Sequence, residues 1–161
     1  MQTPYLPSLL NPQSVAVVGV STDPGKLGSA ILSNIVKNRF QGRIYGVRRA
    51  KDDVPAQIAQ DNVRIVDSFD EIPETVDVVL FAIPANRLLD ALKAVPPAHM
   101  RVAVAIASGF SEVGPEGAAL EKQLREYCNG AGVHLIGPNC QGIVVPRARL
   151  QMTFSSMYNQ M

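Results

Sequence analysis

Residues 15–28, VAVVGVSTDPGKLG, decide the fold of this chain. The first four residues are a continuous apolar run that predicts a buried strand, and a loop rich in Gly, Ser, Thr and Pro follows. After the loop, Leu27, Ala30, Ile31 and Ile35 recur at helical spacing. A strand, a glycine-rich loop and a helix in this order predict a phosphate site. The unpaired N–H groups and positive dipole end of the helix attract an anion, and glycines let the backbone approach it closely.

The composition indicates one globular domain. The chain has 161 residues, of which 47% are hydrophobic and 18% charged, and its net charge of +1 argues against a nucleic-acid or anionic membrane partner. Its two cysteines, Cys128 and Cys140, form no disulfide framework and fit a reducing compartment. No apolar run approaches the roughly 18 residues of a membrane span. We therefore expect a cytoplasmic protein.

Strand and helix patterns alternate along the chain. Apolar runs predict strands at residues 15–20, 44–47, 63–66, 77–83, 102–107 and 133–136. Helical spacing predicts helices at 27–38, 86–94 and 116–128, the last ending at Asn129-Gly130, and a short helix opened by Pro55. Strands that are apolar throughout are typical of a parallel sheet covered on both faces. The prediction is an α/β fold: a Rossmann-like, doubly wound, mainly parallel sheet.

Small or charged residues follow every predicted strand. They are found at 21–28, Arg48-Arg49, Pro84, Ser108-Gly109 and 137–142. In a doubly wound sheet, ligands bind beyond the carboxyl ends of the strands, so these segments are expected to meet at one site.

The first loop departs from two common phosphate-binding motifs. Gly19 and Gly25 are separated by five residues and Leu27 follows Lys26, so the loop is not a Walker A motif, which is G-x4-G-K-[ST]. Ser21 stands where the dinucleotide fingerprint G-x-G-x-x-G has its second glycine. Nucleotide hydrolysis at this loop is therefore not expected.

The residues after the second strand narrow the choice of ligand. A dinucleotide site has an acidic residue there to bind the ribose hydroxyls, but this chain has Arg48-Arg49. Two cations suit a ribose that carries a phosphate. NADP and coenzyme A both fit this requirement, with Lys26 or the loop amides on the pyrophosphate.

Several motifs follow one another in order along nearly the whole chain. They are 14–21 (SVAVVGVS), 24–28 (PGKLG), 40–45 (FQGRIY), 77–79 (DVV), 82–85 (AIPA), 108–112 (SGFSE) and 135–143 (LIGPNCQGI). In this order they resemble the CoA-binding domain of NDP-forming acyl-CoA synthetases, which include the ADP-forming acetyl-CoA synthetases. The motif GPNCQG also resembles the N-terminal domain of the succinyl-CoA synthetase α subunit, and Met152-Thr153-Phe154 resembles the exit into the family's next domain.

The resemblance implies a set of residues that bind coenzyme A. The nucleotide phosphates would lie on the first loop, at Gly19, Ser21, Thr22, Pro24, Gly25, Lys26, Leu27 and Gly28. The path of the adenine and pantetheine would be lined by Ile83, Pro84, Ile106, Ala107, Ser108 and Gly109, and the phosphoryl-transfer end by Asn139 and Cys140. The family's sequence Tyr-Pro-Val-Asn-Pro-Lys is replaced here by residues 45–51, so that Ala50 stands where a lysine would meet the 3′-phosphate. Arg48, Arg49 or Lys51 would take its place.

The chemistry of the resembled enzymes requires parts that this sequence lacks. They form acyl-CoA through an acyl phosphate and a phosphorylated histidine in a second domain, and an ATP-grasp module supplies the nucleotide. This chain has only His99 and His134, neither in a loop expected to face the ligand. Cys140 is expected to shape its loop rather than act as a nucleophile, and Cys128 to lie in the core. We expect no catalytic residue and no metal site.

Three functions follow from these expectations. The first is the CoA-binding domain of an acyl-CoA synthetase or related acyltransferase. It would have residues 1–13 as an arm, 14–146 as the domain, and 147–161 as a tail or linker to a domain with the phosphohistidine and ATP-grasp chemistry. The alternatives are a stand-alone CoA-binding protein without catalysis and half of an NADP-dependent oxidoreductase.

Overall fold

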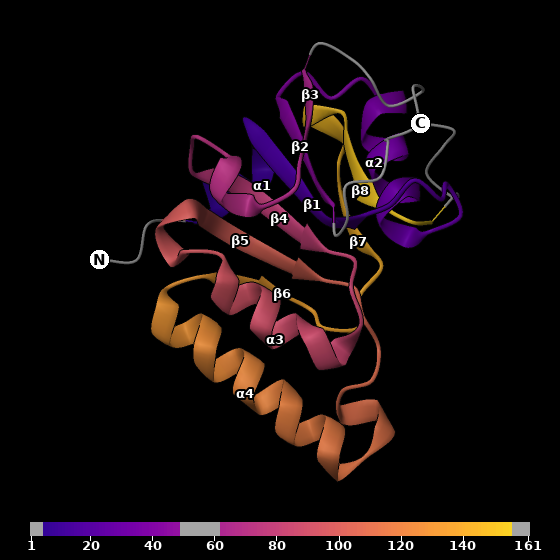
Figure 1. Cartoon of the computed structure of the whole chain (residues 1–161). Helices are drawn as coiled ribbons and strands as arrows, with labels where there is room; N and C mark the ends of the chain where they lie inside the picture. Colours follow the sequence, from indigo (N-terminus) through magenta and orange to yellow (C-terminus); the bar gives the residue numbers. More distant parts are fainter. Residues whose placement is uncertain (1–4, 49–61, 156–161) are drawn as a thin grey trace.

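The computed structural model describes residues 5–48 and 62–155, and it contains a six-stranded parallel sheet (Figure 1). The strand order is β3-β2-β1-β4-β5-β6, so β1 lies between β2 and β4 and the order reverses there. These strands are β1 Ser14–Val20, β2 Arg43–Arg48, β3 Val63–Val66, β4 Val76–Phe81, β5 Met100–Ala105 and β6 His134–Ile136. All five pairings are parallel, which confirms the predicted Rossmann-like, doubly wound sheet.

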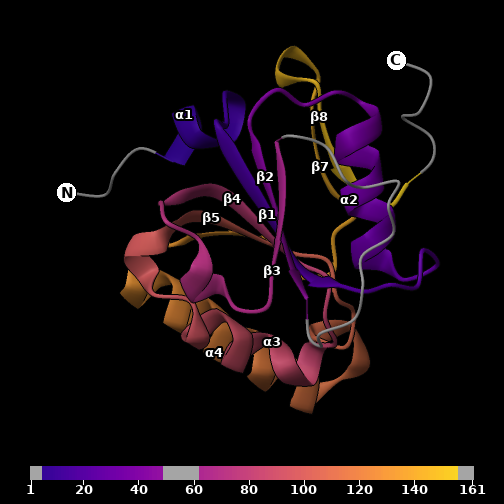
Figure 2. The ribbon, with the colours of Figure 1, turned by 45° about the horizontal axis from the view of Figure 1, so that its top comes forward.

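Helices cover both faces of the sheet, as Figures 1 and 2 show. On one face, α3 and α4 bury Leu88, Leu92 and Leu124 against the sheet. On the other face, α2 buries Ile31 and Ile35. The helices are α1 Tyr5–Leu10, α2 Leu27–Lys37, α3 Ala85–Ala94 and α4 Pro115–Ala131, with short 3₁₀ turns at Phe69–Glu71, Pro97–His99, Ser111–Val113 and Pro146–Ala148. The two buried clusters are typical of apolar strands that contact side chains on both faces.

The N-terminal segment differs from the expected irregular arm. Residues Tyr5–Leu10 form the helix α1, and the ring of Tyr5 stacks on His134 with centroids 3.6 Å apart. His134 is therefore half-buried at the edge strand β6 rather than enclosed within the sheet. The α4 helix is also longer than predicted: it passes Asn129-Gly130 and ends at Ala131, where Gly132, with a left-handed φ of 69°, caps it. The predicted helix at Pro55 lies outside the described residues.

A hairpin follows the sheet. Strands β7 Gly142–Val145 and β8 Leu150–Thr153 pair antiparallel, and β8 packs on α2. Leu150 and Met152 are buried in the same cluster as α2, and the Asn34 side-chain amide donates to the Thr153 carbonyl oxygen at 2.8 Å. Residues 150–153 therefore pack as part of the same folded unit as the sheet.

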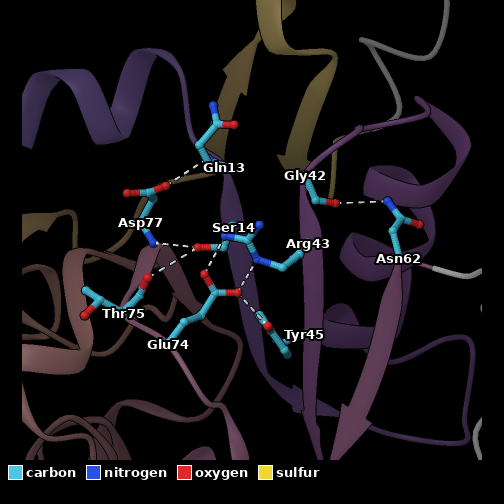
Figure 3. A network of polar contacts seen from close by, with 9 residues as sticks. All are labelled: Gln13, Ser14, Gly42, Arg43, Tyr45, Asn62, Glu74, Thr75 and Asp77. Carbon is cyan, nitrogen blue, oxygen red and sulfur yellow. Dashed lines mark hydrogen bonds and ion pairs between the residues drawn. The ribbon is translucent and has the colours of Figure 1, made fainter.

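Polar side chains tie together the amino ends of the strands, at the opposite edge from the loops singled out above (Figure 3). The Glu74 carboxylate accepts hydrogen bonds from both Arg43 and the Tyr45 hydroxyl, the latter at 2.6 Å. Ser14 Oγ accepts from the Asp77 amide at 3.3 Å, and Asp77 accepts from the Gln13 amide at 2.8 Å. The Arg43 guanidinium lowers the pKa of Glu74 by hydrogen bonding to its charged form.

Replacing Glu74 tests this network. We expect E74Q to lower the free energy of unfolding by about 1 kcal/mol at neutral pH, because the loss of one charge weakens the hydrogen bonds from Arg43 and Tyr45 at a partly exposed site. Since the pKa of Glu74 is lowered in the folded state, its contribution is complete above its ordinary pKa and disappears as the pH falls through the folded value. The difference between variant and wild type should therefore shrink in acid.

Urea unfolding between about pH 3 and 7 measures this difference. A suitable control is E126Q, which removes a carboxylate paired only with the exposed Lys122 at 3.8 Å. Equal effects of the two variants at neutral pH would contradict the role given to Glu74.

Candidate functional site

A large cavity opens at the carboxyl ends of the strands. Its volume is about 1130 Å³, slightly above the range of about 300–1,000 Å³ that is usual for small-molecule sites. Its wall comes from the β1–α2 loop, the end of β2, the β4–α3 turn, the segment after β5, the loop before β7, and Phe154. The cavity thus lies where the strand order reverses between β1 and β4, which is where ligands bind in sheets of this type.

The loop between β1 and α2 is fixed by its own hydrogen bonds. Ser29 Oγ, in the first turn of α2, donates to the Ser21 carbonyl oxygen at 2.6 Å and accepts from the Ser21 amide at 3.1 Å. The Asp23 carboxylate accepts from the Gly25 amide at 2.8 Å, and the Lys26 amide donates to the Asp23 carbonyl oxygen at 3.1 Å. The loop is therefore held in one shape by contacts at both of its ends.

Two glycines allow α2 to begin directly against the end of β1. A Cβ atom on Gly28 would lie 2.3 Å from the Gly19 carbonyl oxygen. Gly19 has a φ of +100°, and a Cβ there would lie 2.6 Å from the Ala82 carbonyl oxygen. These distances are far below van der Waals contact, so only glycine fits at either position. The first turn of α2 is thereby brought to the cavity wall.

The charges around the cavity are all positive. Lys26, Arg48 and Arg87 line it, and no carboxylate is among its lining residues in the described part of the chain. Lys26 is the N-cap of α2 and has extended backbone geometry without a side-chain cap, so the first N–H groups of the helix remain available to an anion. Arg48 is paired with Asp67, which lies outside the wall. The cavity is suited to an anionic ligand that is larger than a single phosphate.

Backbone turns shape the other side of the cavity. The Glu112 carboxylate accepts from the amides of Gly109, at 2.5 Å, and Phe110, at 3.1 Å, and the hydrogen bond from Gly109 is the main reason why the pKa of Glu112 is lowered. The Asn139 amide donates to the Ala107 carbonyl oxygen at 2.9 Å, and the Cys140 thiol to the Ala105 carbonyl oxygen at 3.4 Å. These contacts fasten the loop before β7 to the end of β5.

Most residues singled out from the sequence meet at this cavity. Its wall contains Gly19, Ser21, Thr22, Lys26, Leu27, Gly28, Arg48, Ile83, Pro84, Ile106, Ala107, Ser108, Asn139 and Cys140. Pro24, Gly25 and Gly109 do not line it: Gly25 closes the turn with Asp23, and Gly109 donates to Glu112. Arg49 and Lys51 lie outside the described residues. Cys128 is in the core as predicted, where burial raises the pKa of its thiol to about 11.

The wall also contains residues that the sequence did not single out, namely Val20, Ala82, Ala85, Arg87, Gln141 and Phe154. Val20, Ala82, Ala85 and Gln141 are close in sequence to predicted residues, so the strand ends could have indicated them. Arg87 could have been found as a cation in the first turn of the helix after Pro84. Nothing in the sequence around Phe154 indicates that β8 brings it to the cavity.

The described residues contain neither a candidate membrane-spanning helix nor a candidate metal-binding cluster. No helix among them is both long and apolar enough to cross a membrane. Within residues 5–48 and 62–155, no three His, Cys, Asp or Glu side chains gather in a way that could hold a metal ion.

Comparison with known families identifies the ligand. The family model described as CoA binding domain matches residues 13–146. The chain belongs to this family of CoA-binding domains. This confirms coenzyme A as the ligand implied by the sequence resemblance, and it does not favour the NADP alternative.

Two similar proteins are named as ADP-forming acetate–CoA ligases. The chain is 36% identical to the α subunit of ADP-forming acetate–CoA ligase I from Pyrococcus furiosus, over 92% of this chain and 32% of that protein. It is 34% identical to ADP-forming acetate–CoA ligase I from Archaeoglobus fulgidus, over 91% of this chain and 20% of that protein.

A solved structure shows the same arrangement. The dinucleotide-forming acetyl-coenzyme A synthetase 1 of Ca. Korarchaeum cryptofilum, in complex with phosphate and ADP, superposes with a TM-score of 0.81 at 34% identity. The match covers 96% of this chain and 31% of that one. The chain thus spans a third or less of the length of these three relatives.

The Gly19–Gly28 contact can be tested by adding one methyl group. We expect G28A to lower the free energy of unfolding by about 1–3 kcal/mol, because its Cβ would force α2 away from β1. The matched variant is G130A in α4, where a Cβ meets nothing within 4 Å. This variant should be neutral or stabilising by up to about 1 kcal/mol, because alanine is the better helix former. Chemical denaturation measures both, and a G28A protein as stable as the wild type would contradict the packing described.

Proposed function

We propose that this chain is the CoA-binding domain of an ADP-forming acyl-CoA synthetase and that it holds coenzyme A in the cavity at the carboxyl ends of the strands. The observation that carries the proposal is that the α2 N-terminus and three cations line the same cavity, in a chain of the CoA-binding family. The cavity is large enough for a nucleotide and an extended arm, and its lining carries no opposing carboxylate in the described residues.

Different lining residues would bind different parts of coenzyme A. The pyrophosphate would lie against the β1–α2 loop, where the amides at the start of α2 and the Lys26 ammonium offer donors. The adenine and pantetheine would follow Ile83, Pro84 and Ile106 to Ser108, which present a mainly apolar surface. The thiol would end near Asn139 and Cys140, in the loop that the sequence resemblance assigns to the phosphoryl-transfer end. These residues bind and orient the ligand, and none is assigned a chemical step.

The chemical steps are assigned to other domains or subunits. Neither His99 nor His134 lines the cavity, and His134 is stacked on Tyr5 instead. The relatives are three to five times as long as the aligned region, which leaves room in them for phosphohistidine and ATP-grasp parts. We therefore propose that such parts act with this chain and that the chain alone forms no acyl-CoA. We also place the protein in the cytoplasm, where its free thiols Cys128 and Cys140 remain reduced.

Calorimetry with coenzyme A tests the binding. We expect the wild-type chain to bind CoA in the micromolar range and K26A to bind about tenfold more weakly, because a charge-assisted contact to phosphate is lost. K26A should weaken CoA and 3′-dephospho-CoA equally, since Lys26 is assigned to the pyrophosphate that both ligands share. The control is K122A, on the exposed surface of α4 and outside the cavity. Absence of CoA binding by the wild type at high micromolar concentration would overturn the proposal.

A further inference from the structure

Arg87 is a cation at a place that a helix disfavours. It is the third residue of α3, and the positive end of a helix dipole makes a cation in the first turn unfavourable. Within residues 5–48 and 62–155, its guanidinium forms no hydrogen bond or ion pair that would offset this cost. Its neighbour Leu88 is fully buried and holds α3 on the sheet, so the first turn is firmly placed. Local stability therefore gives no reason for an arginine at this position.

The position of Arg87 gives such a reason, because Arg87 lines the CoA cavity on the α3 side, whereas Arg48 lines it on the β2 side. Val20 of β1 is paired with Arg48 of β2, while the Ala82 amide at the end of β4 donates to the Val18 carbonyl oxygen of β1 at 2.9 Å. Arg48 and the start of α3 therefore flank the end of β1 on its two sides. Two strand spacings amount to about 10 Å, a gap that two arginine side chains can bridge through one phosphate group.

The negative charges of coenzyme A suggest a different role for each of the three cations Lys26, Arg48 and Arg87. Coenzyme A carries a pyrophosphate and a 3′-phosphate monoester, and a monoester has a charge of about −1.5 to −2 at neutral pH. Lys26 and the amides of the α2 N-terminus are placed for the pyrophosphate. Arg48 is already paired with Asp67, so much of its charge is neutralised. Arg87 is the cation on the wall, among the described residues, that has neither a carboxylate partner nor a place on the phosphate loop.

We propose that Arg87 binds the 3′-phosphate of coenzyme A, together with Arg48, and so makes the site selective for CoA over 3′-dephospho-CoA. This inference rests on the proposed function. It assigns the selectivity for the 3′-phosphate in part to α3, and not only to the basic residues Arg48, Arg49 and Lys51 that the sequence places after β2. A planar guanidinium can donate two parallel hydrogen bonds to a phosphate, which gives the contact direction as well as charge. The unfavourable cation at the start of α3 is then compensated when the ligand is bound.

Binding measurements with the pair of ligands test the assignment. R87A should weaken the binding of CoA by about tenfold or more and the binding of 3′-dephospho-CoA by less than about twofold, so that the preference of the wild type for CoA largely disappears. R87K should bind CoA with an affinity between those of the wild type and R87A, because lysine keeps the charge but not the paired donors. The control is K93A, which removes one charge from the last turn of the same helix, outside the cavity, and should leave both affinities unchanged.

A thermal readout separates a ligand contact from a structural role. R87A should melt at the same temperature as the free wild type or slightly higher, because an unfavourable cation is removed, while its stabilisation by CoA is reduced. A lower melting temperature of free R87A would indicate a structural role and would overturn the assignment.

Two binding results would also overturn it: equal weakening of both ligands by R87A, or no weakening of either. If the wild type binds neither ligand, the proposed function itself fails. If the wild type binds both ligands with equal affinity, the proposed function stands and only the selectivity is refuted.

Discussion

The backbone contact between Gly19 and Gly28 sets the geometry on which the site depends. With no Cβ on either residue, the first turn of α2 lies directly against the end of β1, and the Gly19 backbone lies equally close to the end of β4. This contact fixes the position of the α2 N-terminus, whose first residues Leu27 and Gly28 line the cavity at the strand reversal. A side chain at either position would displace the helix N-terminus, the phosphate loop and the adjoining β4–α3 turn together.

Polar groups are arranged differently at the amino ends and at the carboxyl ends of the strands. At the amino ends of the strands, Glu74, Arg43 and Tyr45 satisfy one another, and Ser14 joins Thr75 to Asp77, so charges and donors are paired within the protein (Figure 3). At the carboxyl ends, Lys26 and Arg87 lack such partners in the described residues. Unpaired like charges around a cavity destabilise the free protein, and a polyanionic ligand removes that repulsion. In the same sheet, polar groups at the amino ends of the strands are thus paired within the protein, while cations at the carboxyl ends are left for an anionic ligand to pair with.

The sequence was most informative where structure depends on local pattern. Apolar runs located all six parallel strands to within about two residues. The helix α1 was missed because prolines interrupt its apolar spacing and because its placement depends on the contact of Tyr5 with His134. The turn of the β7–β8 hairpin gave no signal, since Arg149 has the left-handed conformation that glycine or asparagine usually marks. Strand ends indicated most of the cavity, but Arg87 and Phe154 reach it through tertiary packing.

The hydrogen bonds between Ser21 and Ser29 have a consequence for how the ligand is received. They hold the β1–α2 loop in its shape without any contribution from a ligand, and Asp23 with Gly25 fixes the tip in the same way. A preorganised loop loses little conformational entropy when its anion arrives, so more of the interaction energy is available for affinity. Association then requires no closing motion of this loop. In the proposed function, the phosphates would bind first to this preorganised loop, and the flexible pantetheine arm would then bind along the rest of the cavity.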